Sequence, residues 1–219
     1  MNAWQQLDPS SLTLHLAAAI GSDLPGHAAH RSMTHSLAYG RHRGPVPDDA
    51  RQAAVLVVLN PALSGWSIPA VLRPTTMRAH AGQVSLPGGL IETDETVVQA
   101  ALREYEEELG PPPSELQVIG QLTPVYVFVS GFEITPVVAV SPQPLAFRPN
   151  PHEVDAVVEL PLAALCDPAN RGRHIINRRG LRFQVPHFAV SGQQVWGATS
   201  LILAEFVALL RGVGVPPAI

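Results

Sequence analysis

The chain has 219 residues, of which 46% are hydrophobic and 15% charged, so it is long and apolar enough to bury one sizeable core. Its net charge of −4 gives no electrostatic reason to expect a nucleic-acid polymer as partner. No segment approaches the ~20 apolar residues of a membrane span, and the first residues lack the pattern of a signal peptide. We therefore expect a cytoplasmic protein with no membrane partner.

Residues 1–50 are expected to form an N-terminal extension to a domain that spans residues 51–219. Ser10 or Ser11 can cap a short helix that ends at Gly21. A loop rich in His, Gly and Pro is expected from Gly26 to Pro47.

The first strand of the domain is predicted at Ala53–Leu59, a continuous apolar run typical of a strand that is covered on both faces. A partner strand follows at Ile68–Leu72. Helical spacing of apolar residues predicts a helix from about Thr96 to Leu109, capped by Thr93 or Asp94 and ended by Gly110.

The remaining elements are expected to alternate irregularly. Further strands are predicted near residues 116–122, 133–140, 154–160 and 181–188, and an amphipathic helix at residues 198–210. Cys166 lies in an apolar run and is interpreted as a buried structural thiol, since a single cysteine forms no internal disulfide. Strands around helices without regular alternation predict an α+β fold with a mixed β-sheet between helices.

Three glutamates on the predicted 96–109 helix carry the functional signal. Glu104, Glu107 and Glu108 are spaced i, i+3 and i+4, so their carboxylates share one face. A merely solvated acidic face would not crowd like charges into the C-terminal half of a helix, where the macrodipole disfavours anions. A bound divalent cation removes this conflict, because hard cations take oxygen ligands from clustered carboxylates.

Glycines precede this helix in Pro87-Gly88-Gly89. They allow a sharp turn that brings main-chain carbonyls, including that of Gly89, close to whatever the glutamates hold. A cation held in this way can activate water and neutralise charge on phosphate oxygens, as phosphoryl chemistry requires.

The segment resembles the Nudix box, the signature motif of a family of diphosphate hydrolases. The box positions are matched by Gly89, Glu95, Arg103, Glu104, Tyr105, Glu107, Glu108 and Gly110, while Pro111 stands where an aliphatic residue is usual. The resemblance implies an α/β/α sandwich, a Mg²⁺ or Mn²⁺ cofactor, and Glu104 and Glu108 as the principal metal ligands. Glu107 would share a second ion, and Glu95 and Arg103 would hold the loop and helix in register.

The general base varies within the family. Glu153, at the head of the strand predicted near residues 154–160, is an additional candidate for a ligand or base, with a plain surface glutamate as the alternative. His80, His152 and His187 show no metal-binding spacing, and we interpret them as surface or satisfied polar residues.

A second stretch resembles the motif that accompanies the box in coenzyme A pyrophosphatases. Arg78, Gly82 and the Pro-Gly-Gly run match it, whereas Leu86 replaces the usual Phe. Arg73 matches an earlier arginine, but Pro74 stands where Ser is usual. Arg73, Arg78 and Gly82 are therefore the candidates for substrate binding, although Arg78 could instead pin the loop through an ion pair with Glu92 or Glu95.

The sequence thus predicts a metal-dependent hydrolase of coenzyme A or its derivatives, which gives 3′,5′-ADP and 4′-phosphopantetheine or its acyl form. Alternative substrates are ADP-ribose, a dinucleotide or an oxidised nucleotide. A non-catalytic module that senses nucleotides is the alternative from a different functional class. The oligomeric state stays open, with a homodimer as one option.

Overall fold

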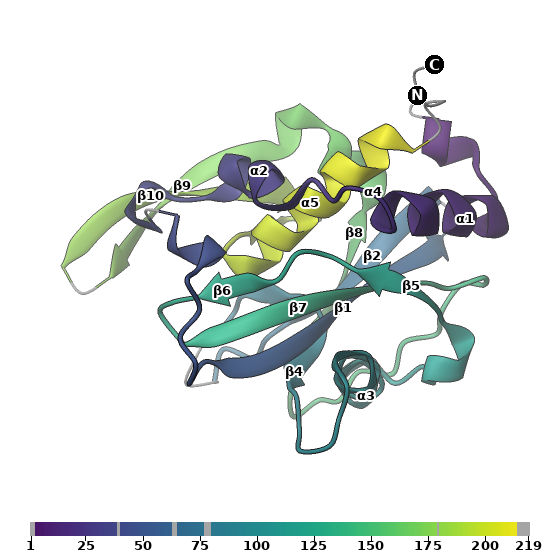
Figure 1. Ribbon diagram of the computed structural model, residues 1–219, viewed down its shortest axis with the longest axis horizontal. Helices are drawn as coiled ribbons and strands as arrows, with labels where there is room; N and C mark the ends of the chain where they lie inside the picture. Colours follow the sequence, from purple (N-terminus) through teal and green to yellow (C-terminus); the bar gives the residue numbers. More distant parts are fainter. Residues whose placement is uncertain (1–2, 39, 63–64, 77–79, 179, 214–219) are drawn as a thin grey trace.

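In the computed structural model, which describes residues 3–38, 40–62, 65–76, 80–178 and 180–213, a mixed β-sheet lies between helices (Figure 1). Its core order is β3-β2-β1-β7-β5, while β4 pairs with β1, β6 with β7 and β8 with β2. Strands β1 and β7 are parallel, and the other pairs are antiparallel. The strands are β1 (Arg51–Ala62), β2 (Gly65–Leu72), β3 (Val84–Ser85), β4 (Gly88–Leu90), β5 (Gln117–Gln121), β6 (Val125–Val127), β7 (Phe132–Val140) and β8 (Ala156–Pro161).

A second, antiparallel sheet follows in the order β11-β10-β9. It consists of β9 (Arg171–Arg178), β10 (Leu181–Val190) and β11 (Gln193–Val195). The sequence predicted only the middle strand, because the other two are polar or very short.

The helices form the outer layers. They are α1 (Pro9–Ile20), α2 (Gly26–His30), α3 (Val97–Leu109), α4 (Leu162–Cys166) and α5 (Ala198–Gly212), with 3₁₀ turns η1 (Ala3–Gln6), η2 (Arg31–Met33), η3 (Ser36–Ala38), η4 (Arg41–Arg43), η5 (Pro113–Glu115) and η6 (Pro168–Asn170). None of these described helices is long and apolar enough to cross a membrane.

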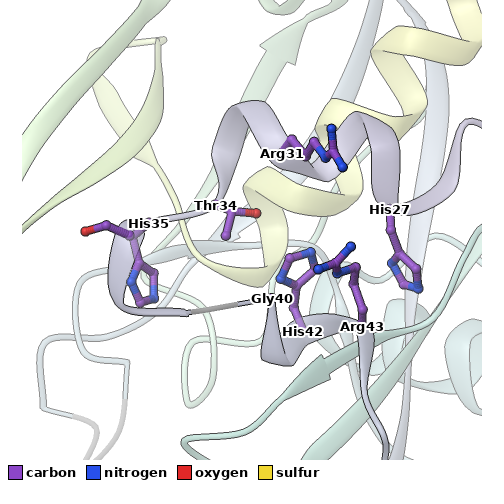
Figure 2. Close-up of a pocket in the computed structure, with 8 residues that line it drawn as sticks. His27, Arg31, Thr34, His35, Gly40, His42 and Arg43 are labelled. Carbon is purple, nitrogen blue, oxygen red and sulfur yellow. The ribbon is translucent and has the colours of Figure 1, made fainter.

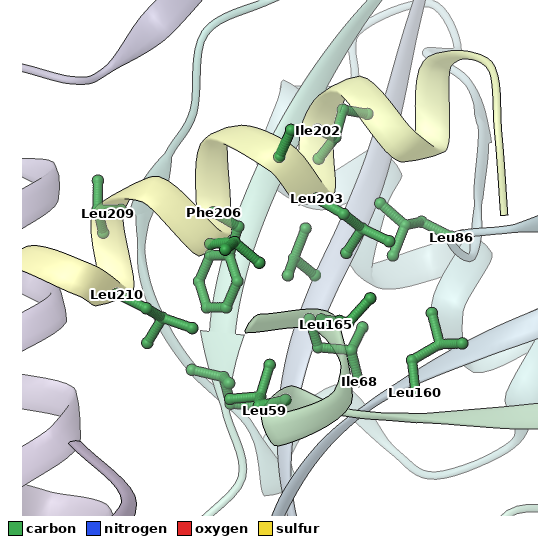
Figure 3. Packing of buried hydrophobic residues seen from close by; sticks show 14 of the residues in the cluster. Leu59, Ile68, Leu86, Leu160, Leu165, Ile202, Leu203, Phe206, Leu209 and Leu210 are labelled. Carbon is green, nitrogen blue, oxygen red and sulfur yellow. The ribbon is translucent and has the colours of Figure 1, made fainter. Parts of the chain in front are cut away.

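Strand β1 supplies side chains to both layers of the core. On one face, Leu56 and Val58 pack with buried residues of α3, and on the other, Val57 and Leu59 pack with α5. Figure 3 shows the second layer, where Phe206 of α5 lies above Leu59. The predicted continuous apolar strand and the α/β/α sandwich are confirmed, because a strand covered on both faces needs apolar side chains at successive positions.

Two predicted helix caps are wrong. Helix α1 begins at Pro9, and the carboxylate of Asp8 accepts hydrogen bonds from the Ser10 and Ser11 amides. Proline takes the first helical position because its missing N–H costs nothing there. Helix α3 is capped by Thr96, which forms a reciprocal capping box with Gln99.

The first 50 residues contribute to the same core as the sheet. Trp4, Leu12 and Leu16 are buried against it, and α2 contacts α5. The segment predicted as a loop from Gly26 to Pro47 contains α2 and three 3₁₀ turns. This covering explains why α5 is buried on nearly all sides, whereas the sequence predicted an amphipathic helix with a free polar face.

Cys166 is a buried free thiol, as predicted. His187, interpreted as a surface or satisfied polar residue, is buried, and its Nδ1 lies 3.0 Å from Nδ1 of His174 on the neighbouring strand.

Candidate active site

Helix α3 is fixed by its apolar face. Ala101, Tyr105 and Leu109 are fully buried against the sheet, which turns the carboxylates toward the edge of β4. Gly110 ends the helix with a φ of 92°, the left-handed conformation that favours glycine. The acidic residues therefore stand on a rigid support.

Glu108 is the most buried of the three glutamates, with only 4% of its surface exposed. Its Oε2 accepts a hydrogen bond of 3.0 Å from the Gly88 amide. Its main-chain carbonyl accepts another, of 3.0 Å, from the amide of Asn150. The carboxylate is thus held between β4 and the 150–153 turn.

The two glycines of β4 make room for this arrangement. Gly88 has a φ of 154°, and a Cβ there would overlap the backbone of β1 at Ala54 and Val55. A Cβ at Gly89 would overlap the carboxylate of Glu104. Sequence analysis identified these glycines, but it did not identify the Gly88 amide as the partner of Glu108.

Arg103 organises the outer part of the acidic face. Its guanidinium donates two hydrogen bonds, of 2.9 and 3.1 Å, to the carboxylate of Glu95, and one of 3.0 Å to the Leu90 carbonyl. The same group contacts Glu104 at 2.9 Å and Glu107 at 3.2 Å. Arg103 and Glu95 therefore tie the 90–95 loop to the helix, and they also offset part of the negative charge.

The electrostatics of the site favour a cation. The pKa of Glu108 is raised to about 7, mainly by burial and also by the charges of Glu104 and Glu153, while the hydrogen bond from the Gly88 amide and the charge of Arg73 act in the lowering direction. The pKa of Glu104 is also raised, mainly by burial and further by Glu107 and Glu153. Carboxylates that resist ionisation in this way gain most from a positive partner.

The donor set fits a hard divalent cation. It consists of carboxylate oxygens from Glu104, Glu107 and Glu108, together with the main chain of β4 beside them. Arg103 already contacts two of these three carboxylates, those of Glu104 and Glu107.

The structure brings the predicted residue Glu153 to this site. Glu153 lies in the turn before β8, where its amide donates to the Asn150 carbonyl, rather than at the head of the strand. The Asn150 amide in turn donates to the Glu108 carbonyl, so this turn is joined to the end of α3, and the charge of Glu153 contributes to the raised pKa of Glu104 and of Glu108.

Two of the three predicted substrate-binding residues lie in the described structure. Arg73 and Gly82 close one loop, in which the Gly82 amide donates to the Arg73 carbonyl at 3.1 Å. The charge of Arg73 acts on Glu108, and its buried Nε has no hydrogen-bond partner among the described residues. Arg78 lies outside the described residues.

Comparisons with known proteins agree with this geometry. The NUDIX domain matches residues 50–179. A Shigella flexneri protein named as the uncharacterized Nudix hydrolase NudL is 41% identical over 173 residues, covering 78% of this chain and 87% of its own. An Escherichia coli O1:K1 protein of the same name is 42% identical over 169 residues, covering 76% of this chain and 85% of its own.

The fold is also that of solved structures. The crystal structure of a Nudix hydrolase from M. smegmatis, RenU, aligns with 77% of this chain and 91% of its own, with a TM-score of 0.55 and 18% identity. At this identity the likeness shows the fold alone.

Proposed function

The chain belongs to the Nudix family of hydrolases, which act on pyrophosphate bonds of small molecules, and we propose that its substrate is coenzyme A or one of its derivatives. The products would be 3′,5′-ADP and 4′-phosphopantetheine, or the acylated form of the latter. The observation that carries the proposal is the arginine-bearing loop from Arg73 to Gly82, which is followed by β3 and then by the glycines of the proposed metal site.

The charge of Arg73 in this loop acts on the Glu108 carboxylate, which supports a role of the loop in substrate binding. The unpartnered Nε of Arg73 gives a donor to phosphate oxygens, and a guanidinium can contact a phosphate with two parallel hydrogen bonds. Coenzyme A carries a 3′-phosphate in addition to its diphosphate, so it needs more than one arginine. Arg78, five residues further along the chain, is the proposed partner of the 3′-phosphate, and Gly82 would let the backbone approach the substrate.

Nudix hydrolases generally use divalent metal ions, and we propose Mg²⁺ or Mn²⁺ for this chain. Glu104 and Glu108 would be the principal ligands, with Glu107 and the Gly89 carbonyl completing the set. When bound, the ion would supply a Lewis acid for the phosphate oxygens and lower the pKa of bound water.

The protein's own residues have distinct proposed tasks. Arg73 would orient the diphosphate and neutralise charge as it develops on the oxygens. Glu153 would accept a proton from the attacking water, and the effect of its charge on Glu104 and Glu108 supports this role. Cleavage would proceed without a covalent enzyme intermediate.

We further propose that the protein is cytoplasmic and forms a homodimer. Size-exclusion chromatography with light scattering tests the dimer.

A panel of diphosphates tests the substrate. The protein with Mg²⁺ or Mn²⁺ is incubated with coenzyme A, acetyl-coenzyme A, ADP-ribose, a dinucleotide and an oxidised nucleoside triphosphate, and products are identified by mass. We expect the highest kcat/KM with the coenzyme A compounds, and a thiol-bearing product from the free form. Faster cleavage of ADP-ribose or a dinucleotide would contradict the proposal but leave the hydrolase assignment in place. No cleavage of any compound would favour a nucleotide-sensing module.

A further inference from the structure

Three histidine rings meet on the side of the main sheet opposite to α3. His27 and His30 lie on α2, which contacts α5, and His42 comes from η4. The ring centroids are 5.3 to 5.9 Å apart, and one nitrogen from each ring lies within 4.8 Å of the others. Figure 1 shows α2 and α3 on opposite sides of the sheet, so this cluster is separate from the carboxylate site.

One of these rings is oriented by a buried carboxylate. Nε2 of His30 lies 3.2 Å from Oε2 of Glu205, and both side chains are fully buried. The other oxygen of Glu205 accepts hydrogen bonds from the Gly26 amide and from the amide and hydroxyl of Thr123. A neutral His30 ring that donates from Nε2 to Glu205 carries its lone pair on Nδ1.

That lone pair faces the second histidine. Nδ1 of His30 is 3.4 Å from Nδ1 of His27, and this separation is close to the ~3.3 Å expected between two nitrogens that bind one tetrahedral Zn²⁺ at 2.0–2.1 Å. A hydrogen bond between the two rings also explains the distance. It does not explain the third ring, because both nitrogens of His42 are buried and have no hydrogen-bond partner among the residues that the structure describes.

A shared cation satisfies all three rings at once, and the carboxylate behind His30 is a common second-shell arrangement for a histidine that binds a metal. We propose that His27, His30 and His42 form a binding site for a transition-metal ion of the Zn²⁺ class, with Glu205 orienting His30. Imidazole nitrogen suits Zn²⁺, Co²⁺ and Ni²⁺, whereas Mg²⁺ prefers the oxygen ligands of α3.

His27 and His42 line a pocket of about 290 Å³, from which a fourth ligand would reach the ion. Figure 2 shows His27 and His42 at one end of this pocket, beside Arg43, with Arg31 above them. The two arginines favour water, hydroxide or a small anion as the fourth ligand. The ion would join η4 to α2 through His42, and the His30–Glu205 contact links α2 to α5, so metal binding would stabilise the fold.

Metal titration of the whole chain tests the site. Excess Mg²⁺ occupies the carboxylate site, Zn²⁺ affinity is measured by competition with a chromophoric chelator, and Co²⁺ is followed by the visible absorption of tetrahedral coordination. We expect one Zn²⁺ per chain, more than ~100-fold weaker binding in His42→Ala and His27→Gln, and ~10- to 100-fold weaker binding in Glu205→Gln. His35→Ala changes a histidine of the same pocket that is outside the cluster, so its affinity should match the wild type.

A second measurement separates binding from folding. Zn²⁺ should raise the melting temperature of the wild type and of His35→Ala but not that of His27→Gln, whose partly exposed ring can be replaced with little effect on packing. The proposal is overturned if the wild type binds less than one Zn²⁺ in the presence of Mg²⁺. It is equally overturned if His27→Gln and His42→Ala bind Zn²⁺ as tightly as the wild type. Neither readout depends on hydrolysis, so the outcome is independent of the proposed substrate.

Discussion

Replacing Glu108 by glutamine is expected to stabilise the metal-free protein while it destroys activity. The substitution keeps the size and helix propensity of the side chain, and the amide oxygen can still accept the hydrogen bond from Gly88. It removes a charge that burial makes costly in the folded state. Stability and function should therefore move in opposite directions.

The size of the effect follows from the pKa of Glu108, which is raised from its ordinary 4.5 to about 7. Each tenfold change in proton affinity corresponds to ~1.4 kcal/mol, so the ionised carboxylate costs the folded state roughly 3 kcal/mol. Because the folded pKa is the higher one, the folded protein binds the proton more tightly. The metal-free wild type should lose this stability as the pH rises from 4.5 through 7.

The assay is denaturation in the presence of a chelator at pH 5 and pH 8. Glu108→Gln should be more stable than the wild type at pH 8 by up to ~3 kcal/mol, or roughly 6–12 °C for a chain of this size, and the difference should shrink at pH 5. At saturating Mg²⁺, its kcat should fall by ~10²-fold or more, which is the range for lost electrostatic stabilisation. Glu106→Gln is the matched control, because Glu106 is exposed on the same helix.

Two results would refute this reasoning. If Glu108→Gln is less stable than the wild type at pH 8, the carboxylate has stabilising partners in the folded protein that outweigh its burial. If the variant keeps more than half of its activity at saturating Mg²⁺, Glu108 is not a principal ligand.

Three further changes address the other parts of the site. Glu153→Gln should lower kcat without weakening Mg²⁺ binding if Glu153 is the general base, and an unchanged pH–rate profile would remove it from the mechanism. Gly89→Ala should weaken Mg²⁺ binding by at least ~10-fold, because the new methyl group displaces the Glu104 carboxylate; wild-type metal affinity would show that the strand can shift to admit it. Arg78→Ala should raise KM for coenzyme A by roughly 10- to 150-fold more than KM for 3′-dephospho-coenzyme A, since a charge-assisted phosphate contact contributes about 1.5–3 kcal/mol. Arg78→Lys keeps the charge but loses the forked contact, so it should show a smaller rise in KM than Arg78→Ala. Arg182→Ala, which removes an exposed arginine elsewhere, is the matched control. Equal losses on both substrates would contradict the 3′-phosphate role.

The parts of the fold that could be predicted from the sequence are those whose signal is local. A continuous run of apolar residues predicts the buried strand β1, and apolar residues at helical spacing predict α3. Gly110 marks the end of that helix. The functional glutamates of α3 can also be predicted from local sequence, because their mutual repulsion and the helix dipole would destabilise an isolated helix. The short strands β3 and β4 carry no such pattern, since main-chain pairing with β2 and β1 alone defines them.

Contacts between distant segments could not be predicted in this way. The sequence of α5 predicts an amphipathic helix, but the polar residue Glu205 is buried because the 26–30 segment covers it. The His27-x-x-His30 spacing is a weak local signal that becomes meaningful only when η4 brings His42 beside it and α5 supplies the carboxylate. Among the isolated histidines, His187 shows the same limitation, since its partner His174 lies on another strand.

The burial of Glu108 gives a physical reason why the acidic helix needs so firm a support. A helix with four glutamates in its C-terminal half would fray if it depended on its own hydrogen bonds. In this protein, Tyr105 and Leu109 anchor that half in the core, and the Glu108 carbonyl accepts the Asn150 amide. Packing energy thus holds the carboxylates in an environment where their ionisation is unfavourable. A divalent cation that offsets their charge removes this cost, and its affinity for the site rises accordingly.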